Sequence, residues 1–289
     1  MIYKFNFDED LSYKAIGSVY GTALNQFSLS EHKDILRIAT TEGFSWGSTG
    51  TKNNLYTLKE ADGLLKVEGL LSGLGKEGET IKSVRFMGNK AYLVTFKTTD
   101  PLYTIDLSNP KAPKKMGELQ VDGYSAYLHP IGENQLLGIG QNSDENGRRT
   151  GVKIELFDIS DFEHPSSQDS ISLPENSYSE LEYNHKALAF RENDNLFAFP
   201  YQVYNNQSPL GGEEVDTMTT SVTMAPQVNN YLGIYQIKEN RLISYQELKD
   251  KSENWGQHRG LIFDLNNTTY ISFFSDDAVV STTLTTKEN

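Results

Sequence analysis

The sequence predicts an all-β protein assembled from a repeated pair of hairpins, and two observations support this prediction. Apolar runs of about five to seven residues alternate with polar turns in a 289-residue chain that contains 16 Tyr, 14 Phe and 23 Gly, a pattern that is typical of short strands. The best stretch for a helix, residues 62–75, is interrupted by Gly63, Gly69 and Gly73, and each interior glycine costs a helix about 1 kcal/mol. We therefore expect strands and turns along the chain.

An outer hairpin forms the first half of the repeat. The segment LYTIDLSNPKAP from Leu102 aligns with IELFDISDFEHP from Ile154, at an offset of 52 residues. The turn Asp106–Pro110 is expected to end its strand, because Asp and Ser cap backbone NH groups and Pro stops the ladder. Matching segments indicate five outer hairpins, which begin at Ile2, Leu55, Leu102, Ile154 and Leu232.

An inner hairpin, made of two apolar strands around a tight polar turn, alternates with the outer one. Its five copies begin at Phe27, Ser83, Ser125, His185 and His258. Two alternating hairpins per unit are typical of the four-stranded antiparallel blade of a β-propeller. We predict a single β-propeller domain over residues 1–289 with about five blades. A fragment of a larger propeller is the alternative.

The two ends of the chain are expected to complete one blade together. The chain opens on an outer hairpin, residues 2–17, and closes with the inner hairpin from His258 and a last strand over residues 278–284. Pairing the two ends would tie both termini into a sheet and remove the open edges that invite aggregation.

A resemblance to a known family is carried by four strings: LNQFSLSEHKDILRIATT, SVRFMGNKAYLVTFKTTDPLYTIDLSNPKAP, GYSAYLHPIGENQLLGIG and YNHKALAF. In this order they resemble the secreted β-propeller family of bacteria and archaea, whose C-terminal propeller is distantly related to WD40 repeats. The resemblance covers nearly the whole chain. It implies an exported or cell-surface location and a binding scaffold, and it supplies no catalytic residues.

Composition excludes several classes of function. The net charge of −13 repels a phosphate backbone, so we expect no nucleic-acid partner. The absence of cysteine excludes disulfide scaffolds, thiolate metal sites and Cys nucleophiles. No window approaches the ~18 apolar residues of a membrane helix, and the first ten residues do not form a signal peptide. We expect a monomer with no membrane insertion by this segment, and no cofactor except a possible calcium ion.

The main candidate site is the rim of the expected central channel, where the innermost strands begin. Aligning the inner hairpins on their turns places five basic side chains, and no carboxylate, in the two outermost levels: Lys82, His185, Lys186, His258 and Arg259. Such an excess of positive charge suits an anionic ligand. The alternative is that these residues are ordinary solvated strand ends.

A second candidate is the loop QNSDENGRRTG. Asn142, Asp144 and Asn146 alternate before Gly147, as oxygen ligands do at the start of a calcium loop. The bidentate Glu of an EF-hand would fall on Lys153, which excludes a standard EF-hand. A long polar hairpin loop is the preferred interpretation, and weak Ca²⁺ binding is the alternative.

Two long connections are further candidates. Residues 203–230 form an insertion that exceeds the usual limit of about 15 loop residues, and we interpret it as a disordered loop, a flap over a binding face or a partner-binding strand. The link over residues 41–53 carries Phe44 and Trp46 among Gly, Ser and Thr, where the aromatic rings serve as packing anchors or as a recognition platform.

Two functional hypotheses follow. The leading one is an exported, non-enzymatic propeller that binds a protein or a polysaccharide through one face. The competing one is a propeller lyase or hydrolase that holds an anionic substrate at the rim. The five His show no HxH or HxxxH spacing of a metal site. No GxSxG, P-loop or GxGxxG motif occurs in a strand-to-helix context, so no motif identifies a catalytic residue.

Overall fold

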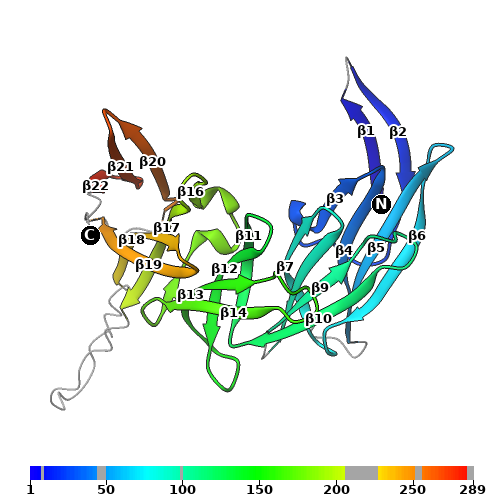
Figure 1. The fold of residues 1–289 in the computed structure, drawn as a ribbon, viewed down its shortest axis with the longest axis horizontal. Helices are drawn as coiled ribbons and strands as arrows, with labels where there is room; N and C mark the ends of the chain where they lie inside the picture. The colour runs from blue at the N-terminus through cyan, green and yellow to red at the C-terminus, as the bar shows by residue number, and fades with distance from the viewer. Residues whose placement is uncertain (8–9, 44–49, 98–99, 206–226, 251–255, 285–289) are drawn as a thin grey trace, which may run out of the picture. The chain divides into compact units, whose positions relative to one another are not determined.

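The computed structural model describes residues 1–289 except 8–9, 44–49, 98–99, 206–226, 251–255 and 285–289. The strands of the described residues form five sheets (Figure 1), and each sheet contains one of the five predicted inner hairpins. The predicted all-β propeller fold is confirmed. The chain divides into two compact units, Met1–Arg149 with Lys153–Ser170, and Thr150–Val152 with Ile171–Asn289.

The first unit holds the first two sheets and most of the third. The first sheet has the order β1-β2-β6-β5-β4-β3, with β1 Ile2–Phe7, β2 Leu11–Gly17, β3 Leu29–His32, β4 Ile35–Gly43, β5 Thr51–Ala61 and β6 Leu64–Leu74. The second has the order β10-β9-β8-β7, with β7 Thr80–Met87, β8 Lys90–Phe96, β9 Asp100–Asp106 and β10 Lys114–Val121. The third has the order β11-β12-β13-β14, with β11 Tyr124–Ile131, β12 Gln135–Ser143, β13 Arg149–Asp158 and β14 Ser166–Ser172.

The second unit holds the last two sheets. One has the order β15-β17-β18-β19, with β16 also paired to β17; its strands are β15 Ser177–Tyr178, β16 Ala189–Arg191, β17 Leu196–Asn205, β18 Gln227–Lys238 and β19 Arg241–Lys249. The other has the order β20-β21-β22, with β20 Arg259–Leu265, β21 Thr268–Phe274 and β22 Val279–Leu284. Three 3-10 turns accompany the strands of the described residues, namely η1 Gln26–Ser28, η2 Glu180–Glu182 and η3 His185–Ala187.

The hairpins close through local turn chemistry. Lys33 and Asp34 have φ of 52° and 61°, and Asn266 and Asn267 have φ of 51° and 60°. Two consecutive residues with positive φ define the two-residue turn whose twist matches that of the flanking strands. The turn after β9 also forms as expected, because Asp106 Oδ1 accepts a hydrogen bond of 2.8 Å from Ser108 N.

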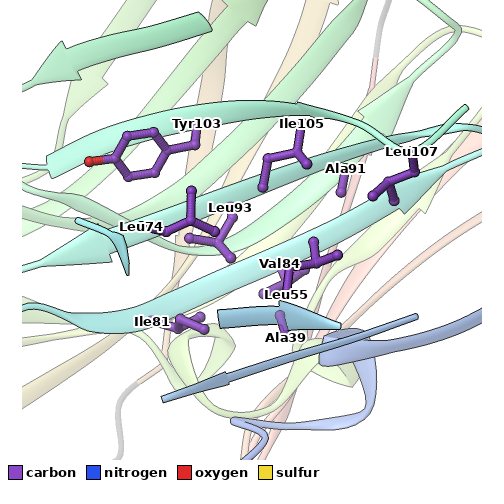
Figure 2. Packing of buried hydrophobic residues seen from close by; sticks show 10 residues of the cluster. All are labelled: Ala39, Leu55, Leu74, Ile81, Val84, Ala91, Leu93, Tyr103, Ile105 and Leu107. Atoms are coloured by element: carbon purple, nitrogen blue, oxygen red, sulfur yellow. The ribbon is translucent and has the colours of Figure 1, made fainter. Parts of the chain in front are cut away.

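Apolar side chains of neighbouring sheets make the core. One cluster combines Ala39 and Leu55 of the first sheet with residues of the second sheet that are almost fully buried, such as Leu93 and Ile105 (Figure 2). Burying an aliphatic side chain stabilises the fold by about 1.5–3 kcal/mol. Each of these two blades therefore buries apolar side chains against its neighbour, as expected for a repeat protein.

A polar contact joins successive sheets of the first unit and recurs with the repeat. Thr57 Oγ1 of β5 donates to the Pro110 carbonyl, and Thr104 Oγ1 of β9 donates to the Phe162 carbonyl at 2.6 Å. A glycine lies beside each contact: a Cβ on Gly69 would meet Pro110 O at 2.2 Å, and one on Gly117 would meet Glu163 O at 2.4 Å. The turns that follow β9 and β13 thus each rest on the preceding blade at a position where only glycine fits.

The N-terminal hairpin differs from the expectation that the two chain ends complete one blade. The β1–β2 hairpin extends the first sheet through a parallel pairing of Ile16 with Leu64, whereas β20–β22 form a sheet of their own (Figure 1). The physical reason is local. Ile2 packs on the apolar cluster around Ile38 and Leu58, and Ile16 N donates to Gly63 O at 3.2 Å.

The two long connections are shorter than the sequence indicated. β17 continues to Asn205 and β18 begins at Gln227, and the two strands pair from Leu196↔Gln236 to Asn205↔Gln227. Part of the expected loop over residues 203–230 is therefore strand, and residues 206–226 lie outside the described residues. Phe44 and Trp46 also lie outside them, so the interpretation of both segments as binding elements stays a prediction.

Candidate functional site

Four of the five rim residues lie in the second unit. His185 and Lys186 lie in η3 and not at the start of a strand, because Asn184 caps this turn by accepting from Lys186 N at 3.2 Å. His258 immediately precedes β20, and Arg259 begins it. The turn η3 packs beside β20. The structure thus brings these two segments together, and a ligand site at these residues stays a prediction.

A carboxylate that the alignment did not include lies among these cations. Glu180 Oε1 accepts from Arg259 Nη1 at 2.7 Å, and Glu180 Oε2 accepts from His258 N at 3.2 Å. The Glu180 side chain is only 8% exposed, and the His258 ring lies 5.5 Å from that of Phe273. Glu180 offsets the positive charge of Arg259. Sequence alignment missed it because η2 lies outside the aligned hairpins.

Lys82 belongs to the first unit, so the five rim residues are not one cluster within either unit. Its Nζ lies 5.6 Å from the centre of the Tyr124 ring, and the Arg149 guanidinium lies 5.4 Å from the same centre. Cations in this position are attracted by the negative face of the ring. Lys82 therefore contributes to a small basic site around Tyr124.

A partly buried cluster of basic and aromatic side chains on β7 and β11 was not found from the sequence. Arg85 donates through Nε to Leu128 O at 2.8 Å, and its guanidinium lies 4.1 Å from the centre of the Phe27 ring. His129 Nδ1 lies 3.1 Å from Tyr127 Oη. Burial, reinforced by the charge of Arg85, lowers the pKa of His129 to about 4. The alternating residues Tyr127 and His129 on β11 are the sequence signal that could have indicated a shared face.

The candidate calcium loop connects β12 to β13 as a polar hairpin loop, in agreement with the preferred interpretation. Asp144 Oδ1 accepts from Asn146 N at 2.9 Å and from Arg148 N at 2.8 Å. Asn142 Oδ1 accepts from Ser143 N. These backbone bonds lower the pKa of Asp144. The carboxylate thus already serves the turn, and the described residues contain no group of three His, Cys, Asp or Glu that could hold a metal.

Calcium binding by this loop stays a prediction with a direct test. If Asn142, Asp144 and Asn146 bind Ca²⁺, millimolar Ca²⁺ raises the melting temperature relative to EDTA, because a ligand that binds only the folded state stabilises it. Asp144→Asn is then expected to remove most of the shift. An identical melting temperature in Ca²⁺ and EDTA would exclude the site.

An exposed aromatic face lies on the N-terminal hairpin. Its five members are 45–84% exposed; they are Tyr3, Phe5 and Phe7 of β1, and Leu11 and Tyr13 of β2. Phe5 pairs with Tyr13, and Phe7 with Leu11, and residues opposite each other in an antiparallel pair share one face. The Phe5 and Tyr13 rings meet edge to face with centres 6.1 Å apart. We call these five residues the aromatic face.

The other side of the hairpin holds it on the first sheet. Lys4 Nζ lies 2.8 Å from Glu31 Oε1 and 3.3 Å from Glu60 Oε2. The hydrogen bond to Glu31 is the main cause of a raised pKa at Lys4. Ile2 packs against the apolar cluster of the first sheet. The hairpin is therefore anchored through one side and presents the aromatic face on the other.

The fold and its repeated blades define this chain as a β-propeller protein. The family model described as "Beta propeller domain" matches residues 1–286, and the chain belongs to this family. It is similar to an uncharacterised protein of Methanocaldococcus jannaschii, with 41% identity over 234 residues that are 78% of this chain and 36% of the relative. An uncharacterised protein of Archaeoglobus fulgidus is 41% identical over 194 residues, which are 67% of this chain and 29% of the relative.

Both of these relatives are archaeal, and the chain spans about a third of the length of each. In the part of the chain that the structure describes, no helix is long and apolar enough to cross a membrane.

Proposed function

We propose that this β-propeller is a binding domain of an exported or cell-surface protein, and that it binds a protein ligand through the aromatic face. The observation that carries the proposal is the exposure of five neighbouring apolar side chains, with Phe7 84% exposed. Soluble proteins rarely leave large contiguous apolar patches exposed without using them for interaction. Aromatic residues are also enriched in the centres of protein interfaces.

The geometry of the rim favours binding over catalysis. In the competing enzyme hypothesis, an anionic substrate binds at five basic residues of the rim: Lys82, His185, Lys186, His258 and Arg259. Arg259 is instead paired with Glu180, and His258 is buried against Phe273. Catalytic groups need to converge on one substrate atom. A residue whose charge is already offset is a weaker anchor for an anionic substrate.

The chemistry of the aromatic face favours a protein over a polysaccharide. All five of its side chains are aromatic or aliphatic, and only the two Tyr hydroxyls are polar. Recognition of a sugar needs several placed hydrogen-bonding groups in addition to stacking rings. The exported or cell-surface location is part of the same proposal and is supported by the sequence resemblance to secreted propellers.

Replacing three aromatic residues of the face tests this proposal. We expect the triple variant Phe5→Thr, Phe7→Thr, Tyr13→Thr to bind a cell-envelope fraction of the source organism at least about tenfold more weakly, since aromatic anchors dominate interface energies. Threonine retains the strand preference of these positions. Binding is measured by co-sedimentation over a range of protein concentrations, and the melting temperature reports whether the fold is retained.

The matched control replaces three exposed apolar residues of another sheet, Leu261→Thr, Leu265→Thr and Val279→Thr, and is expected to bind as the unmodified protein does. Protease treatment of the envelope is expected to abolish binding, whereas periodate oxidation of glycans is not. Loss of binding after periodate alone would identify a polysaccharide ligand. Equal binding by the aromatic-face variant and the unmodified protein would contradict the proposed surface.

A further inference from the structure

A buried guanidinium lies in the first unit without an acidic partner. Arg37 of β4 is 4% exposed. It donates through Nη1 to Gly88 O and through Nη2 to Ser30 Oγ, the latter at 2.6 Å, and its guanidinium lies 4.9 Å from the centre of the Phe86 ring. Its Nε is buried and has no hydrogen-bond partner in the structure. Arg37 belongs to none of the ion pairs among the described residues.

The lack of a counter-charge is unusual for a buried arginine. Removing a cation from water costs several kcal/mol unless an opposite charge compensates for it. Burial lowers the pKa of Arg37, and desolvation is the only cause of the shift. The chain carries 39 acidic residues, and no described Asp or Glu forms an ion pair with this one. The arrangement therefore leaves a positive charge that an external anion can compensate.

Arg37 also lines a cavity of about 130 Å³ between the first and second sheets. Strand β3 contributes its last residue, His32, the β3–β4 turn contributes Lys33, and the β7–β8 turn contributes Asn89. None of the lining residues is acidic, and three of them are basic. The carboxylate of Asp106, a neighbour of the lining residue Leu107, accepts hydrogen bonds from the backbone N and the Oγ of Ser108. The cavity thus combines a buried cation, two partly or fully exposed basic side chains and room for a small ligand.

We propose that this cavity binds a small oxyanion, a carboxylate or a phosphate group, between Arg37 and the basic side chains of His32 and Lys33. Guanidinium groups favour such oxyanions because their NH groups match two oxygens at once. Lys33 supplies a second positive charge from the exposed turn, and His32 adds a ring nitrogen. The cavity is separate from the aromatic face, so the proposal does not depend on that surface.

Thermal unfolding in defined anions tests the site. Inorganic phosphate and acetate are each titrated from 0 to about 10 mM at constant ionic strength held with NaCl, which keeps screening constant. We expect at least one of them to raise the melting temperature in a saturable way by about 2 °C or more. Comparison of the two anions distinguishes a phosphate from a carboxylate as the preferred group.

Variants locate the effect. Lys33→Asn is expected to raise the anion concentration for half-saturation at least about fivefold; asparagine tolerates the positive φ of this position better than most residues. Lys66→Asn removes an equal charge from an exposed residue of β6 that does not line the cavity, and it is expected to leave the titration unchanged. Arg37→Met is expected to abolish the saturable shift.

The results separate the possibilities whether or not Arg37→Met folds. If Arg37→Met does not fold, the anion titrations of His32→Asn and Lys33→Asn test in its place whether the anion binds in this cavity. No saturable shift with either anion would overturn the proposal. An equal shift in the unmodified protein and in Lys33→Asn would also overturn it, because the anion would then act elsewhere.

Discussion

Gly117→Ala is expected to lower the free energy of unfolding by about 3 kcal/mol, at the upper end of the usual cost of overpacking. A Cβ at this position would lie 2.4 Å from Glu163 O and 2.8 Å from Pro165 Cδ. These are atoms of a backbone carbonyl and a proline ring, which cannot rotate away as a flexible side chain can. The third sheet would have to move away from the second and would break the bond from Thr104 Oγ1 to Phe162 O. Chemical denaturation with urea measures the loss.

The matched control is Gly73→Ala. A Cβ on Gly73 meets no atom within 4 Å, although its φ is +76°, so only the conformational cost of about 1 kcal/mol is expected. Thr104→Val provides a second check, because it keeps the shape but removes the hydroxyl that joins the sheets. Equal losses for Gly117→Ala and Gly73→Ala would show that the close contact between the sheets does not limit stability.

Acidification from pH 7 to pH 5 is expected to destabilise the protein by about 1–2 kcal/mol through His129. The pKa of His129 is lowered to about 4 by burial and by Arg85, whereas the unfolded chain has a value near 6.5. Between these values the unfolded state binds a proton that the folded state does not, so stability falls as the pH falls. The loss begins near pH 6.5 and is complete below about pH 4.

The His129→Gln variant isolates this contribution. Its stability is expected to change less between pH 7 and pH 5 than that of the unmodified protein, whatever its stability at pH 7, because the titrating group is absent. His164→Gln, at a His side chain that is 79% exposed, is the control and is expected to retain the full pH dependence. Equivalent pH dependence in His129→Gln and the unmodified protein would show that His129 titrates normally.

The hairpins were predictable from the sequence because their signals are local. The alternation of apolar and polar residues identified each inner and outer pair, and the Asn266-Asn267 turn has the positive φ values that such a hairpin needs. Asp106 caps Ser108 two residues away. Residues so close in sequence meet in any structure in which the two strands form, so these features require no knowledge of the rest of the fold.

The candidate sites were less predictable because they join distant segments. Glu180 pairs with Arg259 across 79 residues, and Arg37 reaches Gly88 across 51 residues. Aligning the hairpins placed His185 and His258 at equivalent positions but could not indicate which acidic residue lies beside them. The N-terminal hairpin shows the same limit, since its pairing partner depends on the contacts of Ile2 and Lys4 with the first sheet.

By itself, the sequence determined the all-β class, the repeat of two hairpins per blade and the absence of cysteine chemistry, because periodicity, turn residues and composition are properties of short segments. Only the tertiary structure decided that Arg37 is buried without an acidic partner, that Glu180 offsets the charge of Arg259, and that the aromatic face is exposed. The physical reason is that burial and charge compensation depend on which segments pack together. An aromatic residue in a strand has the same local sequence pattern whether its face is covered or open to solvent.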